Sequence, residues 1–464
     1  MQKQFSALAK EILKRDNFTI VSHYDADGLT SAAIIAKSLQ REGKSFEIKI
    51  IKQLYKETLQ ELNLENKNVI FTDLGSGQLN LIKNSKIKWC CIVDHHQPLP
   101  INFKNHINAN LLGFSGNNEA SASTLSFLLA KEINPSNIDL ASIAIVGCLG
   151  DMQDSFGSLH GLNKRVLNYG ISANVLELKK DLRLYGRISR PLVQFLMYAS
   201  DPILPELTAN EQNCINFLQN CGIPLKENNS WLCYEDLTLK QKRKLVTELV
   251  LYLAKMNFPE WKIKQLIGEV YLLKKEFKKS ITRDAKEFAT LCNACGRHNK
   301  FEIALKVCLG DRAKYYEKAL SLLQKHRKML RDALQYLQQY PLQENKYFYY
   351  FDAQDNINDN IVGIAAGMLY GSMLLKQNKP IFGLAMQDAE FYKISARATT
   401  ELVENGLNLA EILRDVCKNL ENAECGGHKI AAGARILQKD KEKFLKRLEL
   451  CLKNFFENSS KAEA

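Results

Sequence analysis

The stretch Lys88-Trp-Cys-Cys-Ile-Val-Asp-His-His96 places a carboxylate and two adjacent imidazoles directly after an apolar run. The run predicts a short buried strand that stops at Asp94. A surface loop can carry such a triplet by chance. Three further acidic clusters in the first 155 residues also end apolar segments, and they are His23-Tyr-Asp-Ala-Asp27, Thr72-Asp73 and Gly150-Asp151. Because ligands and metals collect at strand ends in open α/β sheets, we expect the four clusters to meet.

Length, charge and cysteine content limit what the chain can be. Its 464 residues suffice for two or three domains of about 150 residues each. The net charge of +12 fits a polyanionic partner such as nucleic acid, although a lysine-rich surface alone gives the same total. The N-terminus has no signal-type apolar core, and no run reaches the ~18 apolar residues of a membrane span. We therefore expect a cytoplasmic protein with reduced cysteines and no membrane association.

The first 155 residues alternate between strand and helix patterns, which predicts a doubly wound parallel sheet. Expected helices lie at 2–15, 29–39, 120–132 and 138–149, and expected strands at 18–23, 46–51, 69–73, 88–93 and 107–111. From about 155 to 330 the pattern turns helical. Residues 239–286 hold 13 Lys/Arg against 5 Asp/Glu, which indicates either a solvated helical face or a binding surface.

A third, smaller α/β unit is predicted after a long helix at 311–340. We expect its strands at 347–351 and 381–384, a helix from Ile361 to about Leu375, and a Gly/Ala-rich turn at 425–433. The polar tail after Asn458 is expected to be disordered. The boundaries that follow are 1–155, 156–335, 336–458 and 459–464.

Imidazoles combined with several carboxylates form a ligand set suited to manganese, or to two divalent ions bridged by a carboxylate. Each acidic cluster taken alone is more simply a helix cap or a turn. Four clusters that each end an apolar segment favour a metal centre instead. Gly28 gives the backbone freedom to turn after Asp27, and the helix start beyond it offers N–H groups to an anion.

Taken together, these motifs resemble those of the DHH phosphoesterases, specifically the archaeal RecJ-like single-strand exonucleases. The four family motifs correspond to Ser22-His-Tyr-Asp-Ala-Asp-Gly-Leu-Thr-Ser-Ala32, Phe71-Thr-Asp-Leu-Gly-Ser-Gly77, Val93-Asp-His-His-Gln-Pro98 and Val146-Gly-Cys-Leu-Gly-Asp151. Gly426-Gly-His-Lys-Ile-Ala-Ala-Gly433 resembles the signature of the DHH-associated C-terminal domain. Leu182-Arg-Leu-Tyr-Gly-Arg-Ile-Ser-Arg-Pro191 and Asn293-Ala-Cys-Gly-Arg297 resemble the archaeal branch.

The resemblance implies two divalent ions, with Mn²⁺ preferred and Mg²⁺ as the alternative. His23, Asp25 and Asp73 would hold the first ion, and the second would be held by Asp27, Asp73, His95 and Asp151. Asp73 would bridge the two, and His23 is the ligand whose spacing differs most among related enzymes. The catalytic pair would be Asp94, which orients the histidines or touches a metal, and His96, which stabilises the scissile phosphate.

Further residues are expected to bind the substrate. In the C-terminal domain these are Arg397, Gly426, Gly427, His428 and Lys429, whose donors suit a phosphate. Arg187 and Arg190 either contact the strand or lie on a helix surface. On this reading, 1–155 is the DHH catalytic domain, 156–335 a helical connector with a basic insertion, and 336–458 the substrate-binding domain.

The implied function is a metal-dependent exonuclease of single-stranded DNA or RNA in replication or repair, with 5′→3′ digestion of DNA favoured. The alternatives are a 3′→5′ exonuclease acting on RNA or mismatched ends, and a Cdc45-like replisome scaffold that binds GINS or other replisome proteins. A phosphoesterase of very short oligonucleotides or cyclic dinucleotides is a third. No residue decides the polarity, the sugar preference, the partner or the oligomeric state.

Cys292 and Cys295 have the spacing of half a zinc site or of a redox pair. No second Cys-x-x-Cys occurs in the chain. Helical spacing would place both thiols on one face, so core packing is the preferred interpretation.

Overall fold

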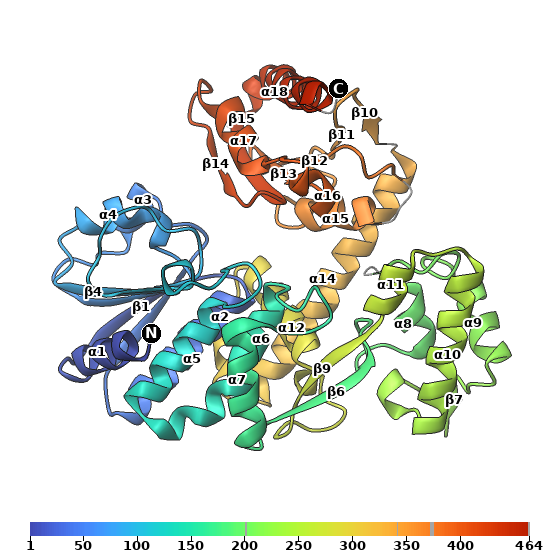
Figure 1. The fold of residues 1–464 in the computed structure, drawn as a ribbon, viewed down its shortest axis with the longest axis horizontal. Helices are drawn as coiled ribbons and strands as arrows, with labels where there is room; N and C mark the ends of the chain where they lie inside the picture. The colour runs from blue at the N-terminus through green and yellow to red at the C-terminus, as the bar shows by residue number, and fades with distance from the viewer. Residues whose placement is uncertain (200–201, 341, 372–374, 463–464) are drawn as a thin grey trace. The chain divides into compact units, whose positions relative to one another are not determined.

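The computed structural model (Figure 1) describes residues 1–199, 202–340, 342–371 and 375–462. It forms two compact units, and each is considered by itself. The first unit contains residues 1–199 and 204–323, and the second contains residues 202–203 and those onward from 324. The segments expected as 1–155 and 156–335 therefore belong largely to one unit. None of the described helices is long and apolar enough to cross a membrane.

A five-stranded parallel sheet forms the centre of the N-terminal region, in the order β2-β1-β3-β4-β5. This confirms the predicted α/β class with a parallel sheet. The strands are β1 (Phe18–His23), β2 (Phe46–Ile51), β3 (Asn68–Thr72), β4 (Trp89–Asp94) and β5 (His106–Asn108). The helices are α1 (Gln2–Leu13), α2 (Ala26–Arg41), α3 (Lys56–Glu61), α4 (Leu79–Lys83), α5 (Ala122–Ile133), α6 (Ala141–Gly150) and α7 (Gly161–Ser172).

Helices cover both faces of this sheet, with α1 and α5 on one side and α3 and α4 on the other (Figure 1). Successive strand residues point to opposite faces. Ile20 and Ile70 therefore join the core built with α1, α2 and α5. Val21 and Phe71 join a second core beneath α3 and α4. Because both faces are buried, β3 and β4 read as nearly continuous apolar runs.

The region after α7 contains a strand pair that the sequence pattern did not predict. β6 (Leu176–Leu182) pairs antiparallel with β9 (Ile267–Leu273). Between them lies an insertion with its own apolar core. It consists of α8 (Leu192–Met197), α9 (Glu211–Asn220), β7 (Lys226–Glu227), β8 (Ser230–Trp231), α10 (Leu239–Lys255) and α11 (Glu260–Gln265). The expected helical middle therefore also contains one strand pair, which the sequence pattern did not reveal because the pairing joins segments far apart in sequence.

Three helices follow β9: α12 (Ala285–Arg297), α13 (Phe301–Cys308) and α14 (Lys314–Gln339). The first two pack against the core of α2, α5 and α6. Cys292 and Cys295 lie buried in α12, and the Cys292 sulfur is 3.6 Å from that of Cys308. In the part of the chain that the structure describes, no cysteine belongs to a candidate metal cluster.

The second unit contains a mixed sheet in the order β10-β11-β12-β13-β15-β14, in which only β11 and β12 are parallel. The strands are β10 (Gln343–Glu344), β11 (Tyr349–Asp352), β12 (Ile381–Met386), β13 (Phe391–Arg397), β14 (Glu424–Gly427) and β15 (Ala431–Leu437). The helices are α15 (Val362–Gly371), α16 (Thr400–Glu404), α17 (Leu409–Cys417) and α18 (Lys441–Ala462). The smaller C-terminal α/β unit is thereby confirmed.

Two details of this unit differ from expectation. Most of the predicted Gly/Ala-rich turn is the β14–β15 hairpin, because its alternating small residues pair across the two strands. Residues 459–462, expected as part of a disordered tail, continue α18, which extends to Ala462. Residues 463–464 and part of the helix predicted at 361–375 lie outside the described residues.

Close packing of α6 against α2 and α5 fixes the frame of the first unit. A Cβ atom on Gly147 would lie 2.2 Å from Ser123 Oγ, 2.4 Å from Thr30 Oγ1 and 2.6 Å from Asp27 Oδ1. Only glycine allows this approach, so the backbone of α6 packs directly against side chains of both neighbouring helices.

Replacing Gly147 with alanine should lower the free energy of unfolding by about 1–3 kcal/mol, because the methyl group has no space. Gly77→Ala is the matched control, since nothing lies within 4 Å of its Cβ position. The control should change stability by no more than about 0.5–1 kcal/mol. Denaturant unfolding of both variants checks this, and equal stabilities would contradict the packing argument.

Candidate metal centre

The predicted metal ligands gather where the parallel strands of the first unit end. β1 ends at His23, β3 ends one residue before Asp73, and β4 ends at Asp94. These strands are neighbours in the sheet, in the order β1-β3-β4. Asp151 follows the last residue of α6. Because these neighbouring strands are parallel, the residues that follow them meet at one edge of the sheet.

Three groups of side chains bring potential ligand atoms within 4.8 Å of one another. They are His23 with Asp25 and Asp73; Asp27 with His95 and Asp151; and Asp73 with Asp94, His95 and His96. All eight residues expected in the centre are thus brought together.

Asp73 lies between the first two groups. Its Oδ2 is 3.5 Å from His23 Nδ1, and its Oδ1 is 3.2 Å from His95 Nε2. The residue is buried, and its backbone is left-handed at φ 59°, a conformation that non-glycine residues rarely adopt outside constrained sites. This arrangement suits a carboxylate that bridges two ions.

Buried polar atoms without hydrogen-bond partners show that the centre fits cations. Among the described residues, neither oxygen of Asp73 accepts a hydrogen bond, and His95 Nε2 and His23 Nδ1 form none. An unsatisfied buried polar atom costs about 1–3 kcal/mol. Four such atoms facing one another, all of carboxylate or imidazole type, are the donor set of Mn²⁺ or Mg²⁺.

A backbone carbonyl fixes the tautomer of His95. The Gly116 oxygen lies 2.6 Å from His95 Nδ1. Because a carbonyl only accepts, Nδ1 carries the proton in this contact. His95 Nε2 then faces Asp73 and Asp151, each at 3.2 Å. This orienting hydrogen bond from the opposite ring nitrogen is typical of metal-binding histidines.

Backbone amides hold the two aspartates of the first motif. Asp27 is fully buried and accepts hydrogen bonds from Ala122 N at 2.7 Å and Ser123 N at 2.9 Å, in the first turn of α5. Asp25 caps α2 by accepting from Gly28 N at 3.0 Å. Helix N-termini stabilise negative charge, so both carboxylates are fixed in position before any ion binds.

Asp94 organises the histidine motif. Its carboxylate accepts hydrogen bonds from the backbone of Ser76 at 3.0 Å, His95 at 2.8 Å and His96 at 3.2 Å. Its Oδ1 also lies 2.8 Å from His96 Nδ1. These contacts occupy the carboxylate, and one of them holds the His96 ring directly, so they favour the first of the two roles expected for Asp94. That role stays a prediction.

Like charges and burial shift the pKa values within the centre. Burial, followed by the charge of Asp73, raises the pKa of Asp27 to about 6. Burial, followed by the charge of Asp27, raises the pKa of Asp151 well above its usual range. Burial would lower the pKa of His95, but Asp73 and Asp151 raise it well above the ordinary value. These shifts have the direction expected of like charges held close together, and bound cations would relieve that repulsion.

Three family models match the chain: the N-terminal domain of the DHH family over residues 17–148, the DHH-CID domain over 184–267, and the DHHA1 domain over 344–454. Uncharacterized protein MJ0831 of Methanocaldococcus jannaschii is 30% identical over 460 residues, which cover 97% of this chain and 96% of that protein. The chain belongs to the DHH family.

Solved structures show that this DHH protein has a RecJ-like fold. Exonuclease RecJ bound to manganese aligns with a TM-score of 0.58 and 18% identity, over 97% of this chain and 94% of its own. RecJ of Thermus thermophilus with Mn²⁺ aligns with a TM-score of 0.59 and 17% identity, and the alignment covers 98% of this chain and 55% of that one. CDC45 of Entamoeba histolytica aligns with a TM-score of 0.70 and 14% identity, and the alignment covers 97% of this chain and 99% of that one. The resemblance drawn from the motifs is confirmed.

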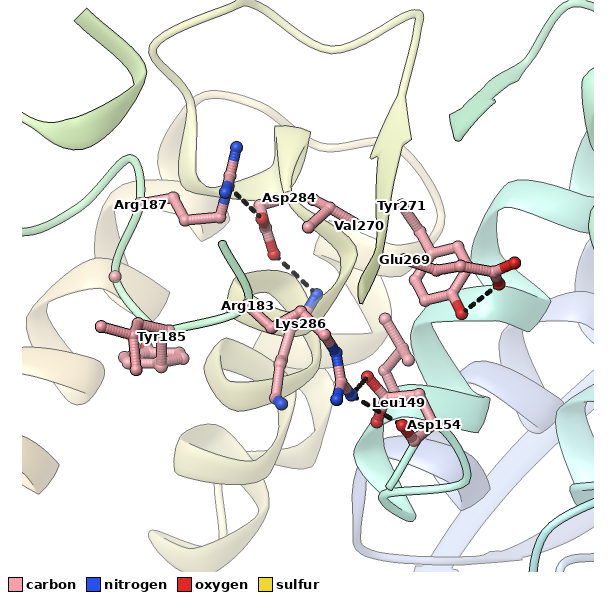
Figure 2. A pocket seen from close by; sticks show the side chains of 12 residues that line it. Leu149, Asp154, Arg183, Tyr185, Arg187, Glu269, Val270, Tyr271, Asp284 and Lys286 are labelled. Atoms are coloured by element: carbon pink, nitrogen blue, oxygen red, sulfur yellow. Dashed lines mark hydrogen bonds and ion pairs between the residues drawn. The ribbon is translucent and has the colours of Figure 1, made fainter. Parts of the chain in front are cut away.

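Arg187 lies away from solvent in the DHH protein and contacts other side chains. Its guanidinium is 3% exposed and pairs with Asp181 at 2.7 Å and Glu235 at 3.2 Å. Asp284 Oδ2 lies 3.7 Å from Arg187 Nε, and this pair is drawn in Figure 2. This placement favours an architectural role for Arg187 over the expected contact with substrate. It links the insertion to the strand β6 from which the insertion begins.

Arg190 is half-buried and donates a hydrogen bond to the Tyr198 carbonyl at 3.1 Å. Its guanidinium also lies over the rings of Tyr185 at 4.7 Å and Tyr198 at 5.3 Å. Its expected contact with substrate stays a prediction.

The remaining predicted substrate residues share one end of the sheet in the second unit. Arg397 pairs in register with Ala431, and Gly427 pairs with Ala432. Gly426, Gly427, His428 and Lys429 are exposed at the tip of the β14–β15 hairpin. Arg397 Nη2 would lie 2.9 Å from a Cβ atom on Gly363, so it passes over the start of α15. The candidate phosphate donors thus form one cluster within this unit.

Several supporting residues were missed from the sequence. Gly116 orients His95, and Asn110 Nδ2 donates to the His95 carbonyl at 3.0 Å. Asn293, quoted only as a branch motif, accepts from Ala26 N at 2.8 Å. A Cβ atom on Gly296 would lie 2.0 Å from the Tyr24 carbonyl. The Asn-Ala-Cys-Gly-Arg motif therefore supports the first acidic loop, which its position in the sequence did not indicate.

Asp73→Asn should abolish most of the stabilisation by Mn²⁺, because Asp73 is the predicted ligand of both ions. For the unaltered protein, Mn²⁺ at 100-fold above its Kd should stabilise by about 2.7 kcal/mol. Without metal, the variant should be at least as stable as the parent, since it removes one buried negative charge. Thermal unfolding with and without Mn²⁺ measures both effects, with Asp16→Asn as an exposed control. An undiminished response to Mn²⁺ would rule out the bridge.

Arg187→Met should lower the free energy of unfolding by about 3–5 kcal/mol, because it leaves partly buried carboxylates without their cation. Arg243→Met, on the exposed face of α10, is the control and should have little effect. Urea denaturation checks stability, and strand binding is measured on the folded fraction. Weakened binding with unchanged stability would restore the expected substrate contact.

Proposed function

We propose that this protein is a metal-dependent exonuclease that hydrolyses phosphodiester bonds of single-stranded nucleic acid in replication or repair, with 5′→3′ digestion of DNA favoured. The observation that carries the proposal is the position of Asp73, whose two oxygens face His23 and His95 of the two candidate ligand groups, with His96 beside them. Two divalent ions bridged by one carboxylate are a common arrangement for phosphodiester hydrolysis.

His23, Asp25 and Asp73 would hold one ion, and Asp27, Asp73, His95 and Asp151 the other. With Mn²⁺ or Mg²⁺ bound, the centre would have a water of lowered pKa and two positive charges for the phosphate oxygens. The protein's own part is to fix these ligands through the amides of α5, the cap of α2 and the Gly116 carbonyl. Such preorganisation stabilises charge as it develops in the transition state.

His96 is the candidate for direct contact with the scissile phosphate. It is the most exposed imidazole of the centre, at 37%, and its Nδ1 is tied to Asp94. Burial works to lower its pKa, but the charge of Asp94 raises the pKa above the ordinary value. A protonated His96 would donate to a phosphate oxygen and stabilise its negative charge.

The second unit would bind the strand away from the reacting phosphate. Arg397 offers a planar guanidinium, and Gly426, Gly427, His428 and Lys429 offer donors at an exposed hairpin tip. These contacts involve phosphate more than base, so binding should depend little on sequence and should weaken as salt rises.

A Cdc45-like scaffold is the second candidate, with GINS or another replisome protein as its partner. The specific observation in its favour is the TM-score of 0.70 to CDC45 over nearly the whole of both chains. That likeness concerns the fold, and one fold can support several functions. The complete ligand set favours the hydrolase. A 3′→5′ exonuclease acting on RNA or mismatched ends would use the same centre.

The test uses single-stranded DNA and RNA of about 20 nucleotides, each labelled at one end or the other, with Mn²⁺. We expect stepwise loss from the 5′ end of DNA, and none with Asp25→Asn. Asparagine is chosen because Asp25 also caps α2 and asparagine keeps the cap. Stepwise loss from the 3′ end, or from RNA alone, would select the alternative polarity or substrate. A metal-loaded protein that cleaves no strand would favour the scaffold.

A further inference from the structure

The loop that follows Asp151 holds two large apolar side chains in solvent. Met152 is 59% exposed and Phe156 is 64% exposed. Between them, Gln153 and Asp154 are buried. We refer to residues 151–157 as the 151–157 loop. An exposed phenylalanine close in sequence to a candidate metal ligand indicates a surface on which something packs.

Hydrogen bonds on the inner side fix this loop in place. Gln153 Nε2 donates to the Gly116 carbonyl at 3.0 Å, the same carbonyl that orients His95. Arg183 Nη2 donates to Asp154 Oδ2 at 2.6 Å. Turn hydrogen bonds join Ser155 N to Met152 O at 3.1 Å and Gly157 N to Asp154 O at 2.9 Å. The exposed side chains therefore extend from a loop that is anchored to the metal centre.

A small pocket adjoins the loop, and both cations and carboxylates line it. Its lining includes Asp154 of the loop together with Arg183, Tyr185 and Lys286. Figure 2 shows the Lys286 side chain running beside that of Arg183. The charge of Lys286 acts on the buried carboxylates of Asp154 and Asp284. Its ammonium forms no ion pair within 4.0 Å among the described residues, whereas Arg183 is paired with Asp154, so we expect Lys286 to be the cation of this pocket that can also contact an anion.

We propose that the 151–157 loop and Lys286 form a nucleotide subsite next to the metal centre. Phe156, with Met152 beside it, stacks on the base of a nucleotide neighbouring the scissile phosphate, and Lys286 holds an adjacent phosphate. The proposal rests on the proposed function and adds a substrate requirement to it. Cleavage needs an unpaired base at one defined position, whatever its identity.

Single-stranded nucleic acid is the occupant that these features fit. Stacking on an exposed ring requires a base that is not already stacked within a duplex. Any of the bases can stack in this way, because each has a π-face. The lysine suits the phosphates that run beside such bases. An apolar peptide would cover Met152 and Phe156, but it would leave Lys286 without an anion.

The test measures binding and turnover of a 12-nucleotide strand of single-stranded DNA and of its RNA counterpart. Strand binding is followed by fluorescence anisotropy without metal, and KM and kcat are measured with Mn²⁺. The variants are Phe156→Ala, Phe156→Trp, Met152→Ala and Lys286→Ala. The matched controls are Phe277→Ala and Lys275→Ala, exposed residues beyond the far end of β9.

Phe156→Ala should raise Kd and KM about 10-fold with kcat within about 3-fold, the scale of one lost base stack. Met152→Ala should give a smaller loss, and Phe156→Trp should keep the parent values. Lys286→Ala should weaken binding several-fold and reduce the salt dependence by about one phosphate contact. Both controls should match the parent protein.

An abasic strand locates the subsite. Strands with a single abasic residue, placed in turn at each of the four nucleotides nearest the digested end, are compared in the parent and in Phe156→Ala. At one position, removal of the base should weaken strand binding by the parent about 10-fold. The same removal should not weaken binding by Phe156→Ala any further, because the base and the ring interact with each other.

The subsite would be overturned if the losses of affinity from the abasic residue and from Phe156→Ala were additive at every position. It would also be overturned if Phe156→Ala bound the strand as well as Phe277→Ala does. The binding assay keeps this separate from the proposed function. A parent protein that binds the strand without cleaving it would refute the exonuclease, and the abasic comparison by anisotropy would still decide the subsite. A parent protein that neither binds nor cleaves the strand would refute both.

Discussion

Mutual repulsion among buried carboxylates is the constraint on which the first unit depends. Asp27, Asp73 and Asp151 all approach His95 Nε2, with Asp27 at 3.9 Å and the other two at 3.2 Å. Removing such charges from water and placing them together destabilises the fold unless they are compensated. Here the compensation comes from helix N-termini and from imidazoles. Bound divalent ions would add further positive charge.

Tight backbone packing is what holds the compensating groups in position. Gly147 lets α6 approach Asp27 and the side chains of α2 and α5, and Gly116 brings its carbonyl to the His95 ring. Asn293 and Gly296 bring α12 against the loop between His23 and Asp25. The centre is therefore supported by elements that carry no ligand, and a change in any of them would move a ligand.

The insertion between β6 and β9 illustrates how a large addition leaves this centre intact. It starts and ends on two paired strands, so its own apolar core forms without disturbing the sheet. Arg187 bridges Asp181 on β6 and Glu235 within the insertion. The likeness to RecJ and CDC45 concerns the fold, and one fold can support several functions.

Local patterns in the sequence were enough to predict the parallel sheet and to single out the eight residues of the candidate metal centre. β3 and β4 are apolar runs that end beside acidic residues, so these runs locate Asp73, Asp94 and His95. The bridging role proposed for Asp73 came from the resemblance of the motifs, because spacing alone does not contain it. The two oxygens of Asp73 face different partners, which fits that role.

Contacts between distant segments decided the rest. The pairing of β6 with β9, the burial of Arg187 and the support that Asn293 gives to Ala26 each join residues far apart in the chain. A charged strand such as Leu176–Leu182 is defined by its partner and has no apolar run of its own. The sequence by itself determined which chemical groups end the strands. Only the tertiary structure decided their orientation, because orientation depends on carbonyls and amides that every residue carries and no sequence pattern distinguishes.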